Sequence, residues 1–211
     1  MIEILRDHGT RLGYEGRTVL SVSDHIYCCG ERWVLMGANG AGKSTFLRSL
    51  TEPELVINGE RKLSVQAHEI AYLPQAPRFS HQMPCSVEDF LVSSLSLILP
   101  LTSSLSENRI DEISSVLQRT GLGAQRTKSI SALSGGQVQR LLLARAFLLK
   151  AKLFLLDEPF SAVQGNAKHE LIELLDEALP GSLQIMALHE PSEIEAVRGS
   201  LIRIQDGKTG H

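Results

Sequence analysis

The residues with the clearest chemistry lie in a glycine-rich segment, residues 37–45, which reads Gly-Ala-Asn-Gly-Ala-Gly-Lys-Ser-Thr. This pattern fits the G-x-x-x-x-G-K-[ST] phosphate loop, in which glycines let successive backbone N–H groups turn toward an anion. In such a loop Lys43 reaches the β- and γ-phosphates and the Ser44 hydroxyl ligates Mg²⁺. The predicted phosphate-binding residues are Gly37, Ala38, Asn39, Gly40, Ala41, Gly42, Lys43, Ser44 and Thr45. The segment therefore predicts a site for the triphosphate of a nucleotide.

Two acidic residues, Asp157 and Glu158, directly follow the apolar run of residues 153–156. A buried parallel strand would end there, at the edge where open α/β sheets bind ligands. We expect Asp157 to hold Mg²⁺, directly or through water, and Glu158 to polarise the attacking water. An acid pair after a strand is, taken alone, more often a solvated turn. Together with a phosphate loop, it indicates a catalytic pair.

The elements around the loop occur in the order that a phosphate loop requires. Residues 33–36 form a short apolar run typical of a buried strand, and residues 44–50 suit a helix. Further along the chain, residues 133–137 read Leu-Ser-Gly-Gly-Gln. Ser134 and Gln137 have capping-box spacing, and residues 138–149 are rich in helix formers. This segment predicts a second helix N-terminus able to take an anion.

With these three motifs the chain resembles the ATP-binding cassette (ABC) ATPases, whose signature stands intact at residues 133–137 and is extended by Gln139 and Arg140. In that family the signature contacts the γ-phosphate of ATP held on the phosphate loop of a second subunit. The resemblance therefore implies a head-to-tail dimer that encloses two molecules of ATP with Mg²⁺. It also implies nucleotide-binding roles for Ser134, Gly135, Gly136 and Gln137.

The resemblance further implies an α/β fold, the P-loop NTPase fold of ABC ATPase type. This fold has a mixed central sheet, an N-terminal antiparallel β subdomain and an inserted helical subdomain. We expect one ABC ATPase domain over residues 1–211. Its core with the β subdomain would cover about 1–76 and 133–211, and the helical subdomain about 77–132.

Three more residues resemble site residues of the family. Gln75 follows the expected strand 70–73 and resembles the glutamine that senses Mg²⁺ and the attacking water, which makes it a predicted catalytic and metal-binding residue. His189 follows the expected strand 185–188 and resembles the switch histidine at the γ-phosphate. Tyr14 resembles the aromatic residue that stacks on adenine. Alone, a histidine after a strand or a tyrosine near a hairpin more often has a surface or packing role.

One position departs from the family pattern. Residues 161–163 are followed by Gln164, where the family has an aspartate that organises the contact between the paired subunits. The substitution keeps hydrogen-bonding capacity but removes the charge. We therefore expect the coupling of the two nucleotide sites, or the rate of hydrolysis, to differ from the family norm. The substitution also raises the alternative of a nucleotide-binding module that no longer hydrolyses ATP. Intact Lys43, Ser44, Asp157, Glu158 and His189 weigh against that alternative.

Composition limits the other classes of function. The chain has 211 residues, is 43% hydrophobic and carries a net charge of −3. It has no run of basic residues, so we expect no nucleic-acid partner. Cys28, Cys29 and Cys85 show no metal or redox spacing, which favours reduced thiols. The N-terminus lacks the features of a signal peptide, and residues 90–106 are too short and too polar for a membrane span.

The pattern of the remaining segments predicts further elements. Strands are expected at 2–5, 19–22, 25–27 and 201–204, and a turn at Asn58 and Gly59 between two short strands. An amphipathic helix near 107–120 would place Ile110, Ile113 and Leu117 on one side and stop at Gly121. A further helix is expected at 167–179.

These features favour a transport ATPase that docks on a separate integral membrane permease. It would be cytoplasmic and peripheral on the cytoplasmic face of the inner or plasma membrane. Residues 72–75, 83–90 and 157–160 resemble zinc and manganese importer ATPases, which work with an extracytoplasmic solute-binding protein. A haem-exporter-type ABC ATPase and a soluble ABC ATPase of iron–sulfur cluster assembly are the alternatives. The sequence leaves the cargo and the direction of transport open.

Overall fold

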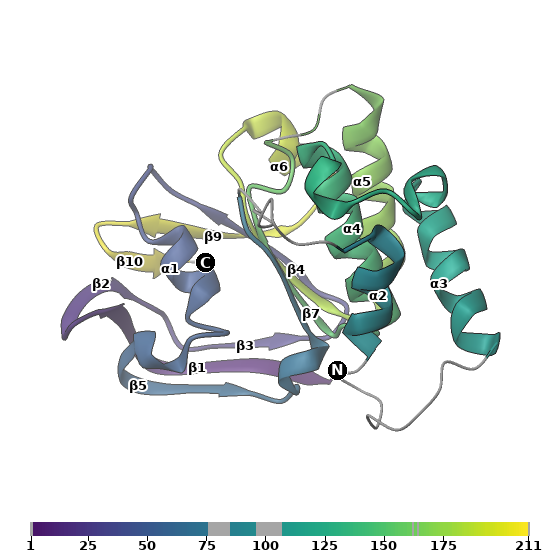
Figure 1. Ribbon diagram of the computed structural model, residues 1–211. Coiled ribbons are helices and arrows are strands. Elements are labelled where there is room, and N and C mark those ends of the chain that lie inside the picture. Colours follow the sequence, from purple (N-terminus) through teal and green to yellow (C-terminus); the bar gives the residue numbers. More distant parts are fainter. Residues whose placement is uncertain (1, 76–84, 96–106, 162, 164, 211) are drawn as a thin grey trace.

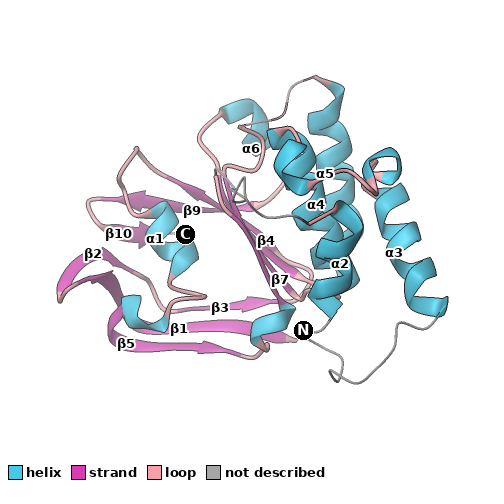
Figure 2. Ribbon diagram, in the orientation of Figure 1, coloured by secondary structure: helices cyan, strands magenta, loops and turns pink. Residues whose placement is uncertain are grey.

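A single sheet of ten strands, with an antiparallel part and a parallel part, runs through the described molecule (Figures 1 and 2). The computed structural model describes residues 2–75, 85–95, 107–161, 163 and 165–210. The strand order is β3-β1-β2-β10-β9-β4-β8-β7-β6, with β5 paired to β1. The strands are β1 (Glu3–Tyr14), β2 (Arg17–Ser21), β3 (His25–Cys28), β4 (Arg32–Met36), β5 (Val56–Leu63), β6 (Ile70–Leu73), β7 (Leu153–Asp157), β8 (Leu183–Ala187), β9 (Ser200–Gln205) and β10 (Lys208–Gly210).

Six α-helices accompany the sheet in the described residues, and most of them gather on one side of it (Figure 2). They are α1 (Lys43–Arg48), α2 (Val87–Leu95), α3 (Glu107–Arg119), α4 (Gly135–Leu148), α5 (Asn166–Ala178) and α6 (Pro191–Val197). Helix α1 lies between the antiparallel strands and the parallel strands, where Phe46 and Leu47 are fully buried in the same core as Leu12 of β1 and Ile185 of β8.

The parallel part of the sheet positions the predicted site. Strands β6, β7, β8, β4 and β9 run parallel, and every residue of β7 and β8 is buried. Such continuous burial explains why residues 153–156 and 185–188 are apolar runs without alternation. Because parallel strands end at one edge of a sheet, the loops after β4, β6, β7 and β8 come together there.

Most of the elements expected from the sequence are confirmed within a few residues. The strands expected at 33–36, 70–73, 153–156, 185–188 and 201–204 correspond to β4, β6, β7, β8 and β9, and the helices expected at 44–50 and 167–179 correspond to α1 and α5. Asp206 and Gly207 form the turn into β10, with φ of 51° and 69°. The prediction of a mixed sheet with an antiparallel N-terminal part is confirmed as well.

Two expectations in the antiparallel part are wrong. The first strand continues to Tyr14 because it pairs with β5 along its length. Asn58 and Gly59 do not separate two strands but lie inside β5. The pairing moves from His8 opposite Glu60 to Arg11 opposite Asn58, so two residues of β1 face one of β5. This is a β-bulge, and Gly59 fits it because a Cβ there would lie 2.2 Å from the Gly9 carbonyl oxygen.

The helices α2, α3 and α4 share one core, which includes Leu91, Ile113, Leu117 and Leu141. Ile110, expected on the same apolar side of α3, is instead 43% exposed. Helix α3 ends before Gly121, as expected, and Gly121 adopts φ of 68°. Because α4 packs with α2 and α3, their common core extends beyond residue 132, and the domain division given above stays a prediction.

Some expectations lie outside the described residues. These are the Gln164 substitution, residues 96–106 of the segment considered for a membrane span, and residues 83 and 84 of the importer-like segment. In the part of the chain that is described, none of the helices combines the length and the apolar character needed to cross a bilayer.

Candidate functional site

The predicted phosphate loop connects the end of β4 to the start of α1. Gly40 and Gly42 adopt φ of 78° and 105°, a conformation that side-chain-bearing residues rarely take. Gly42 also lies against β2, since a Cβ on it would be 3.4 Å from Cγ1 of Val19. Beside the loop lies a cavity of about 470 Å³, lined by Asn39, Gly40, Gly42, Lys43, Ser44, Thr45, Gln75, Glu158 and His189.

Lys43 is buried within the loop that it follows. Its side chain is directed back to the turn, where Nζ donates hydrogen bonds to the carbonyl oxygens of Gly37 at 2.8 Å and Ala38 at 3.1 Å. The residue is 7% exposed. A desolvated ammonium group beside a glycine-rich loop can attract an anion, and this fits the β- and γ-phosphates of a nucleotide.

Asp157 is the last residue of β7 and is 6% exposed. Burial raises the pKa of its carboxyl group, and the Glu158 charge acts in the same direction, whereas a hydrogen bond from Ser44 and the Lys43 charge lower it. A buried carboxylate is costly unless a cation is close. Paired with the Ser44 hydroxyl, it offers the oxygen ligands that Mg²⁺ prefers, so the residues present fit this ion.

Glu158 adopts φ of 49°, which turns its side chain into the cavity away from the line of β7. Its backbone N–H donates to the Ala187 carbonyl oxygen at 3.1 Å, which fixes the end of β7 to the end of β8. The Gln75 amide donates to Glu158 Oε2 at 2.5 Å. Nδ1 of His189 lies 3.8 Å from Glu158 Oε1. The structure thus brings together three predicted catalytic side chains, which follow β6, β7 and β8.

Tyr14 lies at the end of β1, beside α1. Its hydroxyl is 3.5 Å from Thr45 Oγ1 and 3.5 Å from Nη1 of Arg48, and the residue is 41% exposed. It does not line the cavity of about 470 Å³ described above. An exposed ring next to the phosphate-loop helix is placed to stack on a base, and that role stays a prediction.

Gly37, Ala38 and Ala41 face a different side of the loop. They line a neighbouring cavity of about 550 Å³, which is lined on its other side by residues 203–207, at the end of β9 and in the turn into β10. Gly37 is required there because a Cβ would lie 2.9 Å from the Ile204 carbonyl oxygen.

The expected capping box at the start of α4 is confirmed. The Gln137 N–H donates to Ser134 Oγ at 3.4 Å, and the Ser134 N–H donates to Gln137 Oε1 at 3.1 Å. None of residues 134–137 belongs to the described lining of the phosphate-loop cavity. That a second subunit supplies the signature to this cavity stays a prediction.

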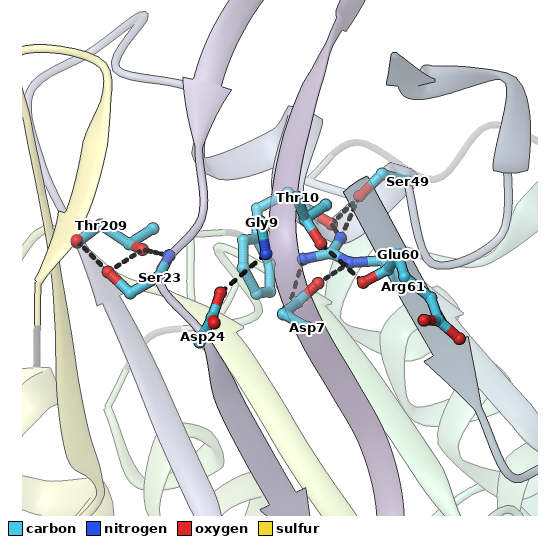
Figure 3. A network of polar contacts seen from close by, with 10 residues as sticks. Asp7, Gly9, Thr10, Ser23, Asp24, Ser49, Glu60, Arg61 and Thr209 are labelled. Atoms are coloured by element: carbon cyan, nitrogen blue, oxygen red, sulfur yellow. Dashed lines mark hydrogen bonds and ion pairs between the residues drawn. The ribbon is translucent and has the colours of Figure 1, made fainter. Parts of the chain in front are cut away.

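A buried ion pair between two residues far apart in the chain holds α1 on the antiparallel strands (Figure 3). Arg61 of β5 donates two hydrogen bonds to Asp7 of β1, at 2.6 and 2.8 Å, and their side chains are 2% and 0% exposed. Arg61 also donates to Ser49 Oγ and lies 4.5 Å from the ring centroid of Phe46. The available sequence signal for this pair was Asp7, a charged residue that follows the apolar residues of β1. Its partner, however, lies 54 residues away in the chain.

The sheet, the phosphate loop and the acids at the end of β7 together define a P-loop nucleoside triphosphatase. The profile of the ABC transporter family matches residues 24–161. The chain therefore belongs to the ABC transporter family, as an ATP-binding subunit of the kind that hydrolyses ATP. In such transporters these subunits pair with membrane permease subunits.

Individual relatives agree with this assignment. A probable metal transport system ATP-binding protein of Chlamydia trachomatis is 32% identical over 184 residues, covering 84% of this chain and 71% of the relative. The zinc transport system ATP-binding protein AdcC of Streptococcus pneumoniae is 31% identical over 185 residues, covering 82% and 79%. A solved ATP-binding subunit of an ABC transporter has the same fold, with a TM-score of 0.84 at 23% identity, and covers 99% of this chain and 88% of that one.

Proposed function

We propose that this chain energises the import of a divalent metal ion, such as zinc or manganese, through a separate membrane permease. The proposal for hydrolysis rests on one observation, the meeting of Gln75, Glu158 and His189 at one side of the phosphate-loop cavity. The proposal for the cargo rests on the relatives, because one is named for metal transport and another for zinc transport.

Each side chain has a distinct role in binding. Lys43 and the loop amides hold the phosphates, and Tyr14 stacks on the adenine. Ser44, Asp157 and Gln75 hold Mg²⁺, which when bound neutralises charge on the β- and γ-phosphate oxygens. The Ser134 end of α4 in a second chain covers the γ-phosphate, so two chains enclose two nucleotides.

Hydrolysis follows from the position of Glu158. Water attacks the γ-phosphorus, the bond to the β,γ-bridging oxygen breaks, and ADP and inorganic phosphate are released. The Glu158 carboxylate orients the water and accepts its proton, while the Gln75 amide holds Oε2 and leaves Oε1 on the side of His189. His189 contacts the γ-phosphate. Release of phosphate removes the charge that binds the two chains, so the dimer reopens.

Replacement of Glu158 by Gln tests this role. Glu158→Gln keeps the shape of the side chain but removes the base, so ATP binding stays intact, the dimer remains closed with Mg-ATP, and turnover falls by about 10²-fold or more. Light scattering after gel filtration measures the dimer, and phosphate release measures turnover. Glu173→Gln, on the exposed face of α5, is the matched control and keeps wild-type turnover. Unchanged turnover of the Glu158 variant would contradict the proposal.

The cargo and the membrane association need a separate experiment. We propose that the chain lies on the cytoplasmic face of its membrane. It is therefore expected to be recovered from membranes, bound to its permease. The complex in proteoliposomes, together with an extracytoplasmic solute-binding protein, takes up Zn²⁺ or Mn²⁺ when ATP is supplied. Recovery with soluble proteins alone, or ATP-driven uptake of neither ion, would overturn the transport part while leaving the ATPase part intact.

A further inference from the structure

Lys168 of α5 contacts the segment that follows Glu158 and the segment that follows His189. Its Nζ lies 2.7 Å from Glu193 Oε1 and 3.8 Å from Glu190 Oε2, both near the start of α6. It also lies 5.8 Å from the ring centroid of Phe160, which is 2% exposed. Glu190 is the residue after His189, and Phe160 is two residues after Glu158. One ammonium group thus joins the two loops that carry the predicted base and the predicted switch residue.

The burial of these groups indicates that the contact is stable. The Glu193 side chain is 6% exposed and that of Lys168 is 29% exposed, whereas the Glu190 side chain is 51% exposed. Within the described residues, Lys168 is the cation that forms an ion pair with Glu193. A nearly buried carboxylate that loses its cation pays a large desolvation cost, so the 2.7 Å contact holds α6 firmly on α5.

The position of His189 depends on this anchor. Upstream of His189, the Leu188 N–H donates to the Leu35 carbonyl oxygen at 3.3 Å, which ties the loop to β4. Downstream, α6 spans seven residues, and its Glu193 N–H bonds the Glu190 carbonyl oxygen at 3.1 Å. His189 is therefore held between the sheet on one side and a short helix that Lys168 fixes on the other.

We propose that Lys168 is a positioning residue for hydrolysis, which keeps His189 beside the Glu158 carboxylate. The inference rests on the proposed ATPase function of this site. Lys168 does not touch the nucleotide cavity, and its effect passes through the loop after β8 and the segment after β7. It therefore acts on the rate of hydrolysis and leaves the phosphate loop, and with it ATP binding, unaltered.

Lys168→Met tests the proposal because methionine fills similar space without the charge. We expect kcat to fall about 10- to 100-fold while the Kd for a fluorescent ATP analogue stays within about twofold of wild type, since a small displacement of a reacting group costs rate without costing binding. Lys168→Arg keeps the cation and restores most of kcat. A role in folding alone would lower the melting temperature and leave kcat per folded molecule unchanged.

Lys152→Met is the matched control. Lys152 forms a more exposed ion pair with Glu69, at 2.5 Å, near the start of β7 and away from the site. We expect it to keep wild-type kcat. Should Lys168→Met fail to fold, Glu193→Gln carries the test, because it retains the shape of the buried side chain but removes the charge that Lys168 binds, and kcat falls with unchanged Kd.

A spectroscopic readout separates this inference from the proposed function. In ¹H–¹³C spectra of the imidazoles, the His189 signal, assigned with His189→Ala, is expected to shift in Lys168→Met and to stay in place in Lys152→Met. An inactive wild-type chain would overturn the ATPase proposal without affecting this comparison. Wild-type kcat in both Lys168→Met and Glu193→Gln, or an unmoved His189 signal in Lys168→Met, would overturn the positioning role.

Discussion

The amide nitrogen of Gln75 donates a hydrogen bond of 2.5 Å to Oε2 of Glu158, so the residue predicted to sense the metal also holds the predicted base. The amide oxygen of Gln75 remains available for Mg²⁺, since the contact with Glu158 uses the nitrogen. One side chain would therefore connect the proposed metal site directly to the carboxylate that is proposed to orient water.

Replacement of Gln75 by Glu would place a second carboxylate next to that of Glu158. Two like charges at this distance raise the pKa of one member of the pair. Because the base must be ionised to act, the rising limb of the pH–rate profile is expected to move to higher pH. Gln75→Ala removes the contact without adding a charge, so kcat falls by about one order of magnitude with no such shift. Identical pH profiles for the two variants would contradict this account.

The buried carboxyl group of Asp157 is expected to lower the stability of the folded protein in the absence of Mg-ATP. Burial raises the pKa of its carboxyl group above the ordinary value of 3.8. The native state then holds more protons than the unfolded state between that value and the raised native pKa, so this group lowers stability as pH rises through the window. Asp157→Asn is expected to raise the melting temperature of the nucleotide-free protein at neutral pH by roughly a few degrees, and to abolish Mg-dependent hydrolysis.

Urea unfolding at several pH values between about 4 and 8 measures this effect. The gain from Asp157→Asn grows with pH across the window and then levels off. Asp111→Asn, on the exposed face of α3, serves as the control and changes stability little at any pH. A gain for Asp157→Asn that is largest at the acid end would reverse the sign that we derive.

The buried pair of Asp7 and Arg61 makes a prediction about stability. Arg61→Met leaves the Asp7 carboxylate buried without a cation and is expected to cost about 3–5 kcal/mol in free energy of unfolding. The double variant with Asp7→Leu recovers most of this loss, since both charges are then absent. Arg6→Met, which breaks the exposed pair with Glu3, costs far less, because solvent screens that pair. Equal losses for the two single variants would show that burial of the pair does not set its importance.

Tyr14 provides a test of base recognition. Tyr14→Ala is expected to weaken ATP binding about tenfold with kcat little changed, because stacking of a base on an aromatic ring stabilises the bound state by about 1–3 kcal/mol. Tyr14→Phe keeps the ring and is expected to bind as the wild type does, since the hydroxyl contacts are long, at 3.5 Å. Titration of a fluorescent ATP analogue measures both. Wild-type affinity in Tyr14→Ala would exclude the stacking role.

The amino-acid sequence by itself determined the chemistry of this protein. The predicted functions of residues 37–45, Asp157 with Glu158, and residues 134–137 follow from local spacing, because a loop of glycines, a strand that ends in acids and a capped helix are each built from neighbours in the chain. The apolar runs that became β7 and β8 were readable for the same reason, since full burial on both faces selects continuous hydrophobic segments.

The tertiary structure decided what residues far apart in the sequence do together. Gln75 and Glu158 are 83 residues apart and Asp7 and Arg61 are 54 residues apart, so no periodicity in the chain could pair them. The same holds for the bulge that places Gly59 opposite Gly9 and for the contact between Lys168 and Glu193. These relationships arise when strands align and helices pack, because packing and register depend on the whole core and are absent from any local segment.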